Sequence, residues 1–377
     1  MRAAVFHRPG VMVVEDRPVP GFGDDEILVR VRAASVCGTD LRISRHGHFK
    51  IPAGARRVQG HEFAGDVAGV GAQVAGFAVG DRISVTPNVG CGHCRFCRQG
   101  LNNMCPDYEA FGISIDGGFQ EYVRIPAIAL QRGNVFHLPA DLDHTAAAMV
   151  EPFSCCLRGQ EALQVGYQDT VLIIGAGPIG AFNVMLAKLA GARLVMVANR
   201  SRPRLDRMVD FGADVLIHTV EQDLEQEVSA RTGGRGVDVI LTCASDPSVQ
   251  ALSVQLLATH GRLNFFAGLG VAEPVGIDTN RVHYRGLTLT GTTGSSNSDY
   301  AKALGLAGGG RVDLGRLVTA SFELEDINDA FAYAASGAGM KAVISFPDDD
   351  GHDRRAAGSD RARTVTAVAT TTSGAVR

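Results

Sequence analysis

The spacing of hydrophobic positions changes near residue 150, and this change divides the chain into two regions. In the first region, short apolar stretches alternate with turn residues, and Gly-Asp pairs at 65–66 and 80–81 interrupt the pattern. The apolar stretches are MRAAVF, ILVRVRAASVC, FAGDVAGVG, RISVTPNVG and EYVRIP. Short strands separated by such turns predict a compact, barrel-like antiparallel β domain.

In the second region, apolar strands alternate with segments of helical periodicity. The segment TVLIIGAGPIGAFNVMLAKLAGARLVMVANR predicts a strand, a glycine-rich turn, a helix and a second strand. VDVILTCAS and GRLNFFAG predict further strands with a helix between them. Strands that alternate with helices favour a parallel, doubly wound sheet, so the fold class is α/β plus β. We expect the last strand, MKAVISF, to return to the first domain.

These patterns give provisional domain boundaries. We predict the β-barrel domain over 1–150 with a cysteine lobe at 88–107, the dinucleotide-binding domain over 151–284, and a return to the first domain over 285–347. Residues 348–377 are poor in hydrophobic residues and rich in small polar ones. Such a composition predicts a disordered C-terminal extension.

Composition and charge exclude several classes of function. The 377 residues suffice for two domains, and the net charge of −4 gives no support to a nucleic-acid-binding surface. No apolar run reaches the ~18–20 residues that a membrane span needs. The first twenty residues lack the apolar core of a signal peptide, so we expect a cytoplasmic protein.

Four of the eight cysteines lie in one stretch, CGHCRFCRQGLNNMC, with the spacing C-x2-C-x2-C-x7-C. Four thiolates complete the tetrahedral shell of Zn²⁺ and leave no open position, so the spacing favours a structural zinc site. An iron–sulfur cluster is the alternative, although the spacing differs from common ferredoxin patterns. We interpret His93, inside the lobe, as a loop residue. The predicted ligands are Cys91, Cys94, Cys97 and Cys105.

The sequence Gly175-Ala-Gly177-Pro178-Ile179-Gly180 follows an apolar strand and opens a helix. In this context a G-x-G-x-x-G motif indicates a dinucleotide site, because its glycines permit a tight turn and a close approach of pyrophosphate to the backbone. The helix N-terminus offers free N–H groups to the phosphates.

The end of the next strand, where NAD-binding sites usually carry an acidic residue, holds Asn199. Arg200, Arg202 and Arg204 follow it. Without the acid nothing repels a 2′-phosphate, and Arg200 could pair with one, so we favour NADP over NAD.

A second metal site is suggested by Cys37 in SVCGTD, His61 and Glu62 in QGHEFAG, and Glu151 in MVEPFSCC. A thiolate, an imidazole and a carboxylate can hold zinc with a fourth, exchangeable position. Glu62 and Glu151 could alternate as the ligand, or one of them could support the ligands from outside the shell, and the spacing leaves this open.

The chain resembles the zinc-dependent medium-chain dehydrogenases/reductases, in the polyol (sorbitol/iditol) and threonine dehydrogenase branch, over about residues 1–347. The motifs that carry the resemblance occur in the family's order: SVCGTD, GHE-x2-G-x5-G, the four-cysteine lobe, DGGFQEY, VEP and G-x-G-x-x-G. The resemblance implies a GroES-like β-barrel catalytic domain joined to a Rossmann domain.

The resemblance also implies roles for individual residues. Cys37, His61 and Glu62 would bind catalytic zinc, with Glu151 in or beside its shell. Apart from the resemblance, we expect Thr39 to help to pass a proton outward. Each subunit would hold two zinc ions. Residues near the nicotinamide would be Gly268, Leu269, Thr292 and Thr293, while Cys243 ends a strand at the nucleotide edge, where we weigh packing against cofactor contact.

One position departs from the family pattern. Relatives often place a histidine five residues after the first zinc cysteine as a proton carrier, and here that position is Arg42. Arginine stays charged, so it cannot act as an ordinary acid or base. Thr39 with water, Glu151, His46 and His48 are the candidate replacements.

The sequence therefore predicts a zinc-dependent oxidoreductase that moves hydride between NAD(P) and a secondary alcohol of a polyol, a cyclitol or a sugar derivative. Oxidation of an amino alcohol, as in L-threonine 3-dehydrogenases, is the alternative within the enzyme class. A non-catalytic nucleotide-binding protein and a zinc-ribbon-like interaction module are two further hypotheses. We expect a small-molecule substrate and a homo-oligomer, with a tetramer favoured over a dimer. Specificity would come from residues 43–58 and the surroundings of Phe111.

Overall fold

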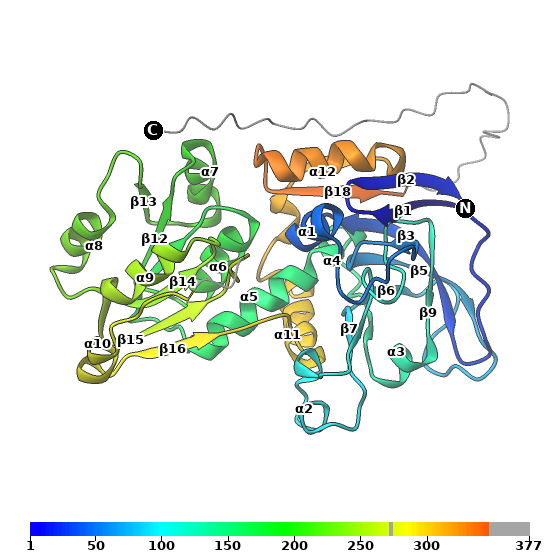
Figure 1. Ribbon diagram of the computed structural model, residues 1–377. Helices are drawn as coiled ribbons and strands as arrows, with labels where there is room; N and C mark the ends of the chain where they lie inside the picture. The colour runs from blue at the N-terminus through cyan, green and yellow to red at the C-terminus, as the bar shows by residue number, and fades with distance from the viewer. Residues whose placement is uncertain (271–273, 347–377) are drawn as a thin grey trace.

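The computed structural model describes residues 1–270 and 274–346. Figure 1 shows two domains side by side, one built mainly from the first 150 residues and the other from the green and yellow part of the chain. The predicted extension at 348–377 lies outside the described residues.

The first domain is built on a twisted, mainly antiparallel sheet with the strand order β10-β6-β5-β3-β18-β17, and β9 also pairs with β3. Its apolar residues alternate along the strands and pack into one core that includes Val29, Phe63 and Ile83. A smaller sheet has the order β2-β1-β4. The bounds are β1 Arg2–Arg8, β2 Val11–Asp16, β3 Ile27–Ser35, β4 Arg57–Val58, β5 Glu62–Val70, β6 Arg82–Val85, β9 Tyr122–Ile125, β10 Val135–His137, β17 Val318–Phe322 and β18 Lys341–Ser345.

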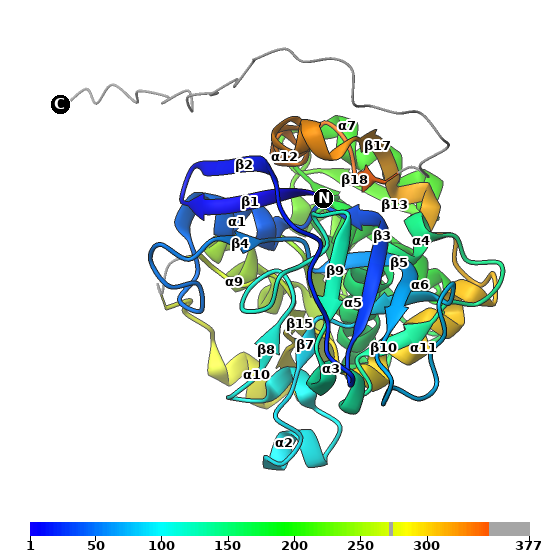
Figure 2. The ribbon, with the colours of Figure 1, turned by 90° about the vertical axis from the view of Figure 1, so that its right-hand side faces the viewer.

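Short helices fill the connections of this domain. Helix α1 follows β3 directly, and its N-cap is Cys37. The helices are α1 Gly38–His46, α3 Ala127–Gln131, α4 His144–Ala148 and α12 Ile327–Ser336. Figure 2 shows α12 and β18 beside the N-terminal hairpin, although they come from the end of the described chain.

The second domain is a six-stranded sheet in which every neighbouring pair is parallel, with the order β13-β12-β11-β14-β15-β16. This is the doubly wound order expected of a dinucleotide-binding domain. The strands are β11 Thr170–Ile174, β12 Leu194–Asn199, β13 Val215–His218, β14 Val237–Thr242, β15 Leu257–Phe265 and β16 Thr288–Gly291. The connecting helices are α6 Pro178–Leu189, α7 Arg202–Asp206, α8 Leu224–Thr232, α9 Pro247–Leu256 and α10 Thr279–Arg285.

Alternate residues of the central strand β11 enter two different cores. Val171 and Ile173 pack toward α5 and α6, whereas Leu172 and Ile174 pack toward the opposite layer. A strand that is buried on both faces reads as a continuous apolar run, which explains the sequence TVLII.

The end of the chain shows where the predicted boundaries and the sheets differ. β18 pairs antiparallel with β3 through Val343 and Ser35, so the chain does return to the first sheet. However, β16 is hydrogen-bonded along β15 and completes the parallel sheet. The predicted boundary at 284 therefore lies too early, because the parallel sheet runs to Gly291.

Two helices at the junction pack against each other and tie the domains together. They are α5 (Val150–Leu163) and α11 (Asn297–Gly308). Phe153 of α5 and Tyr300 of α11 belong to an apolar cluster that also holds Ala64 of the first sheet and Val171 of the second. A shared core of this kind fixes the two domains on either side of the candidate site.

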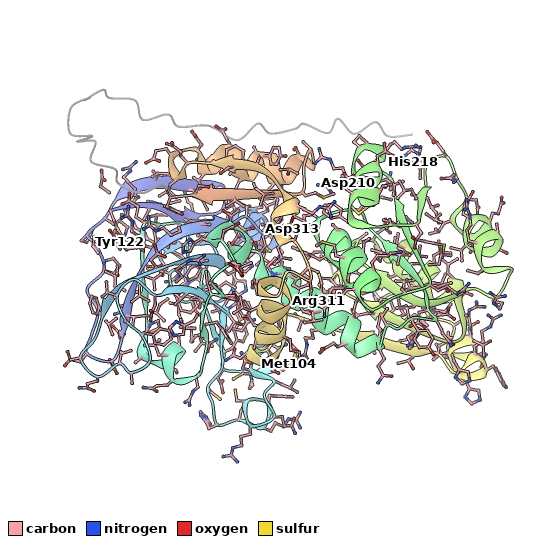
Figure 3. The ribbon with its side chains drawn as sticks, turned by 180° about the vertical axis from the view of Figure 1, so that it is seen from behind. Met104, Tyr122, Asp210, His218, Arg311 and Asp313 are labelled. Carbon is pink, nitrogen blue, oxygen red and sulfur yellow. The ribbon has the colours of Figure 1, made fainter. Side chains whose placement is uncertain are left out.

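The cysteine lobe projects from the first domain at the lower edge of Figure 1. It contains β7 (Asn88–Val89), α2 (Arg95–Arg98), the short 3-10 turn η1 (Asn102–Met104) and β8 (Glu109–Ala110). In the view from behind, Met104 marks the lobe beneath α11, while His218 lies on the far domain (Figure 3). Among the described residues, no helix is both long and apolar enough to cross a membrane.

Candidate active site

Three predicted ligands of the catalytic metal meet at the inner edge of the first sheet. Cys37 caps helix α1, and His61 and Glu62 stand where β5 begins. One ligand atom from each of the three lies within 4.8 Å of the other two. Both His61 and Glu62 are buried. Residues separated by 24 positions in sequence thus form one compact S, N, O donor set, which suits zinc.

A buried carboxylate connects two of these ligands. Asp40, in the first turn of α1, accepts a hydrogen bond from the backbone N–H of Cys37 at 2.9 Å through Oδ2. Its Oδ1 lies 3.3 Å from Nδ1 of His61, as an ion-pair contact. Burial lowers the pKa of His61, but Asp40 and Cys37 together raise it well above its usual value. Because Asp40 faces Nδ1, it leaves Nε2 of His61 for a metal.

The two carboxylate oxygens of Glu62 have different surroundings, since one contacts a lysine and the other has no partner. Oε2 lies 2.5 Å from Nζ of Lys341, which also donates to the carbonyl of Val36 at 2.9 Å. Oε1 is buried without a hydrogen-bond partner in the described structure. A buried, unpartnered carboxylate oxygen is costly, and a metal ion would satisfy it. The donor set therefore fits zinc.

Glu151 stands beside this set but outside it. It lies in the first turn of α5, it is 7% exposed, and the 4.8 Å group does not include it. Burial raises the pKa of Glu151, and Glu62 adds to the rise, while His61 opposes it. Its Oε1 accepts from Sγ of Cys155 at 3.5 Å.

The DGGF motif, residues 116–119, is hydrogen-bonded to the backbone that leads into His61. The N–H of Gly117 donates to Val58 O at 2.8 Å, and that of Gly118 donates to Gly60 O at 2.7 Å. A Cβ on Gly117 would lie 2.1 Å from the Gly60 oxygen, so only glycine permits this approach. The DGGF motif and the GHE motif at 60–62 therefore pack together as one unit.

A cavity of about 190 Å³ opens above the metal position, between the two domains. Thr39, His61 and Glu151 line it close to the metal ligands in sequence or space, and Thr293 and Gly294 line it from the second domain. The other lining residues are Arg42, His48, Pro87, Asn88, Tyr108, Ala110, Phe111 and Ile113. Of the predicted specificity region, His48 and Phe111 line this space. His46 is exposed and lies outside the lining.

The four lobe cysteines also converge. Their Sγ atoms lie within 4.8 Å of one another, a spacing compatible with Zn–S bonds of ~2.3 Å. The backbone N–H groups of Cys94 and Cys97 point at sulfur atoms of the set, at 3.4 and 3.5 Å. Hydrogen bonds from the backbone of His93 and Cys94 lower the pKa of Cys91 to about 6. The ring of His93 is exposed and contacts Cys91 O, as a loop residue would.

The lobe contacts the wall of the cavity directly. The side chain of Asn103 donates to Thr293 O at 2.8 Å. The neighbouring Asn102 accepts the backbone N–H of Asn297, at the start of α11, at 2.9 Å. The lobe therefore fixes the segment that closes the cavity from the second domain.

The glycine loop has the geometry of a phosphate cradle. Gly175 adopts φ +120°, a left-handed region that favours glycine. A Cβ on Gly180 would lie 2.0 Å from Gly175 O, whereas a Cβ on Gly177 would meet nothing within 4 Å. Gly177 is the N-cap of α6 and Pro178 and Ile179 begin the helix, so the open side of Gly177 faces free helix N–H groups.

The predicted ribose residues divide into two groups. Asn199 accepts the N–H of Ala176 at 3.2 Å and donates to Ser201 O, so its amide supports the glycine loop. Arg200 has an exposed side chain. Arg204, in contrast, donates from Nε to Gly337 O at 2.8 Å, which turns its guanidinium toward the segment between α12 and β18.

The remaining predicted cofactor residues lie along the carboxyl ends of the parallel strands. Thr292 follows β16 and donates to Asn264 Oδ1 at 3.2 Å, and Thr293 reaches the cavity. Gly268 and Leu269 follow β15. Cys243 follows β14, its Sγ faces the amide of Asn183 at 3.6 Å, and burial raises its pKa to about 12. That contact agrees with packing for the thiol.

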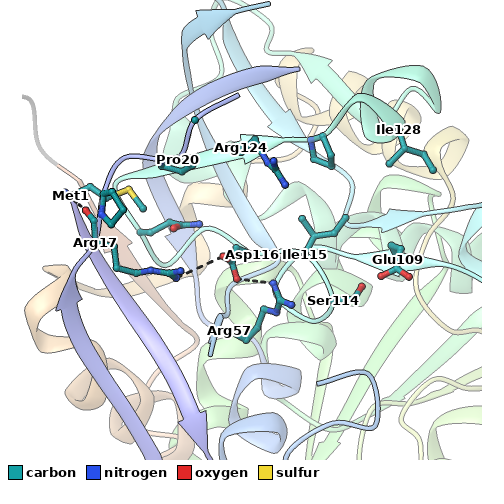
Figure 4. Close-up of a pocket in the computed structure, with 14 residues that line it drawn as sticks. Met1, Arg17, Pro20, Arg57, Glu109, Ser114, Ile115, Asp116, Arg124 and Ile128 are labelled. Atoms are coloured by element: carbon teal, nitrogen blue, oxygen red, sulfur yellow. Dashed lines mark hydrogen bonds and ion pairs between the residues drawn. The ribbon is translucent and has the colours of Figure 1, made fainter. Parts of the chain in front are cut away.

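A second cavity, of about 550 Å³, lies in the first domain on the other side of the segment 109–116. Figure 4 shows Arg17 and Arg57 both directed at Asp116. The distances are 3.8 and 2.8 Å, so this carboxylate balances the two guanidinium groups. Neither the metal ligands nor the glycine loop line this cavity, and we place the candidate active site at the first one.

Sequence reasoning missed two charged residues of the site. Asp40 belongs to the SVCGTD motif, so its position next to Cys37 could have indicated it. Lys341 gave no signal, because 279 residues separate it from Glu62.

Known proteins resemble the chain over nearly its whole described length. Residues 23–139 match the family "Alcohol dehydrogenase GroES-like domain", and residues 178–308 match "Zinc-binding dehydrogenase". A sorbitol dehydrogenase of Bacillus subtilis (strain 168) is 32% identical over 338 residues, covering 89% of this chain and 93% of the relative. An L-threonine 3-dehydrogenase of the same strain is 33% identical over 341 residues, covering 88% and 94%.

A solved structure of a related protein has the same fold. A chain described as a zinc-binding dehydrogenase of Sinorhizobium meliloti 1021, bound to NADP, superposes with a TM-score of 0.84 at 30% identity. The match covers 91% of this chain and 98% of that one.

Proposed function

Because this chain belongs to the zinc-dependent medium-chain alcohol dehydrogenases, we propose that Cys37, His61 and Glu62 bind a catalytic zinc ion. The chain is an NAD(P)-dependent oxidoreductase that acts on alcohols. One observation carries the assignment of the site: the three donors form one group, and one of them, His61, lines a cavity that both domains enclose. The four lobe cysteines would hold a second, structural zinc, giving two ions per chain.

When bound by Cys37, His61 and Glu62, zinc would supply a Lewis acid for the alcohol oxygen, and a nicotinamide cofactor on the glycine loop would supply the hydride acceptor. The chain's own residues orient the reactants. Asp40 holds the ring of His61 by its Nδ1 side. Lys341 balances the buried charge of Glu62. The shared core of α5 and α11 keeps the cavity aligned with the glycine loop, which would bind the pyrophosphate.

We infer that the proton leaves from the hydroxyl through Thr39 and then through His48. Both residues line the cavity, whereas His46 does not. Nδ1 of His48 accepts the backbone N–H of Lys50 at 3.1 Å, which leaves Nε2 for exchange with water. Replacing His48 with Gln should lower kcat at neutral pH, and added imidazole should restore part of it. His46→Gln is the control, and equal rates in both variants would exclude this route.

For the cofactor we propose a preference for NADP over NAD. Support comes from Asn199, which occupies the usual acidic position without a negative charge, and from the exposed Arg200 beside it. Arg204 is held by Gly337, so Arg200 is the better partner for a 2′-phosphate. The other proposed cofactor residues are Gly175, Gly177, Pro178, Ile179, Gly180, Gly268, Leu269, Thr292 and Thr293.

The proposed substrate is a secondary alcohol of a polyol, a cyclitol or a sugar derivative. L-Threonine is the competing substrate, since a relative named for it is as similar as the sorbitol dehydrogenase. The test is a spectrophotometric screen for reduced nicotinamide, with NAD⁺ and NADP⁺ each combined with polyols, inositols and L-threonine. Activity on threonine alone would reverse this choice, and activity on none of these alcohols would contradict the substrate class.

We further propose a homo-oligomer, with a tetramer favoured over a dimer, in the cytoplasm. The resemblance to the family supports the assembly. None of the eight cysteines, all of which the structure describes, forms a disulfide, which suits a reducing compartment. Light scattering coupled to size-exclusion chromatography would measure the mass of the assembly.

A further inference from the structure

A segment that contributes Arg42, His48 and His61 to the lining of the cavity carries an excess of positive charge. Residues 41–61 run from helix α1 to the metal ligand His61 and contain no aspartate or glutamate. Over the same stretch they contain five basic residues: Arg42, Arg45, Lys50, Arg56 and Arg57. A charged segment usually meets compensating carboxylates elsewhere in the fold, and this one meets them only in part.

Two of the five are neutralised away from the cavity. Arg57 pairs with Asp116 at 2.8 Å, and Arg56 lies 3.8 Å from Glu15. Lys50 has no carboxylate partner in the described structure. Its ammonium donates to Tyr108 O at 2.5 Å and stands 4.4 Å from the centre of the Tyr108 ring. The charge of Lys50 is therefore held at the cavity wall without being cancelled.

Arg42 is the cation that lines the cavity itself. In residues 1–270 and 274–346 its guanidinium has neither a hydrogen bond nor an ion pair. It follows Thr39 by three residues on α1, so the two side chains share one face of the helix. Thr39 stands at the metal end, and Arg42 lies about 4.5 Å further along the helix axis.

The positive charge of Arg42 and Lys50 also affects the pKa of a neighbouring histidine, His48. His48 is partly buried in the same wall, and its pKa falls below the usual value because of burial, then Arg42, then Lys50. The lining residues include a single carboxylate, Glu151, which is 7% exposed and lies beside the metal ligands. The lining of the cavity thus offers the cation Arg42, with Lys50 held against the lining residue Tyr108, and no carboxylate other than Glu151.

We propose that the substrate of this enzyme carries an anionic group, a carboxylate or a phosphate, several bonds away from the reacting carbon, and that Arg42 binds it. The inference rests on the proposed function and specifies its substrate class. A planar guanidinium with five donors suits the oxygens of either group. L-Threonine fits less well, because its carboxylate stands only two bonds from the reacting carbon and the ammonium on the carbon between them would face Arg42 and Lys50.

The test is equilibrium binding to the zinc-loaded enzyme with NADPH bound, measured by calorimetry. Sorbitol and mannitol are each compared with their 6-phosphate and with the corresponding aldonate. At least one anionic form should bind about tenfold or more tightly than its neutral parent. The phosphate and aldonate arms tell which anion the site takes. The preference should disappear in Arg42→Gln and persist in Arg45→Gln, an exposed arginine of the same helix that does not line the cavity.

Equal binding of neutral and anionic forms by the wild type, no binding of any anionic form, or an undiminished preference in Arg42→Gln would overturn the inference. Circular dichroism and zinc content of each variant establish that it is folded and loaded. The binding measurement does not depend on turnover. An enzyme that oxidises neutral polyols without an anion preference would keep the proposed function and lose this inference. An enzyme that binds the anions but oxidises no alcohol would support this inference and contradict the proposed function.

Discussion

Nζ of Lys341 lies 2.5 Å from Oε2 of Glu62, and both side chains are buried. The lysine comes from β18, the last strand of the described chain, and the glutamate from the start of β5. Burial lowers the pKa of Lys341, but Glu62 and then Cys37 raise it above its usual value, so the lysine stays charged. The returning end of the chain therefore supplies the counter-charge of the candidate metal site.

Replacing Lys341 with Met should destabilise the fold. It leaves the buried carboxylate of Glu62 without a partner, and removing one member of a buried pair costs about 3–5 kcal/mol. Urea unfolding of the zinc-free protein would measure the loss. Lys302→Met is the matched control, because Lys302 pairs with Glu161 at 2.7 Å on the surface, where ion pairs contribute about 0–1 kcal/mol. Equal losses in the two variants would contradict a special role for Lys341.

Replacing Gly117 with Ala should displace His61. The added Cβ would lie 2.1 Å from Gly60 O, and backbone at that distance must move. We expect the variant to lose about one zinc ion per chain while the four-cysteine site stays filled. Atomic absorption of the purified variant gives the count. Gly305→Ala is the control, since a Cβ there meets nothing within 4 Å. Full zinc content in Gly117→Ala would show that the loop tolerates the shift.

Replacing Asn103 with Ala should weaken substrate binding without removing either zinc ion. The amide of Asn103 holds Thr293 O, and Thr293 lines the cavity. Losing one hydrogen bond of about 1 kcal/mol predicts a rise of roughly fivefold in KM, with a smaller change in kcat. Steady-state kinetics would test this, with Arg98→Ala, an exposed residue of α2, as the control. An unchanged KM would mean that the lobe does not fix the cavity wall.

Replacing Arg200 with Ala should change the choice of cofactor. If Arg200 pairs with the 2′-phosphate, KM for NADP⁺ should rise about tenfold or more and KM for NAD⁺ should stay close to the wild-type value. Arg204→Ala should leave the ratio of the two KM values unchanged, because its guanidinium is bound to Gly337 O. A wild-type enzyme that prefers NAD⁺ would contradict our interpretation of Asn199 and Arg200.

Local motifs were enough to predict the features that depend on neighbouring residues. The strand, turn and helix around Gly175 lie where the sequence places them, because apolar periodicity and glycine geometry act over short distances. The sulfur cluster of the lobe follows from cysteines within fifteen residues of one another. The start of β16 at Thr288 was misassigned, because a short edge strand looks the same whichever sheet it joins.

Contacts between segments that are distant along the chain could not be predicted from the sequence. Lys341 reaches Glu62, Asn103 reaches Thr293 and Arg204 reaches Gly337 only because two domains pack around α5 and α11. The sequence separation of these pairs gives no indication that the two residues are in contact. For the same reason the sequence could not distinguish Glu62 from Glu151, whereas the structure groups Glu62 with Cys37 and His61.

The central claim is that zinc held by Cys37, His61 and Glu62 is required for the oxidation of alcohols. The most direct measurement is zinc content together with turnover in Cys37→Ser. We expect the wild type to hold two zinc ions per chain, and the variant to keep the lobe zinc and lose the other. Its turnover should fall by at least about a thousandfold, because the metal supplies several kcal/mol of stabilisation in the reaction. A Cys37→Ser enzyme that holds one zinc ion in the lobe and oxidises alcohols at the wild-type rate would contradict the account.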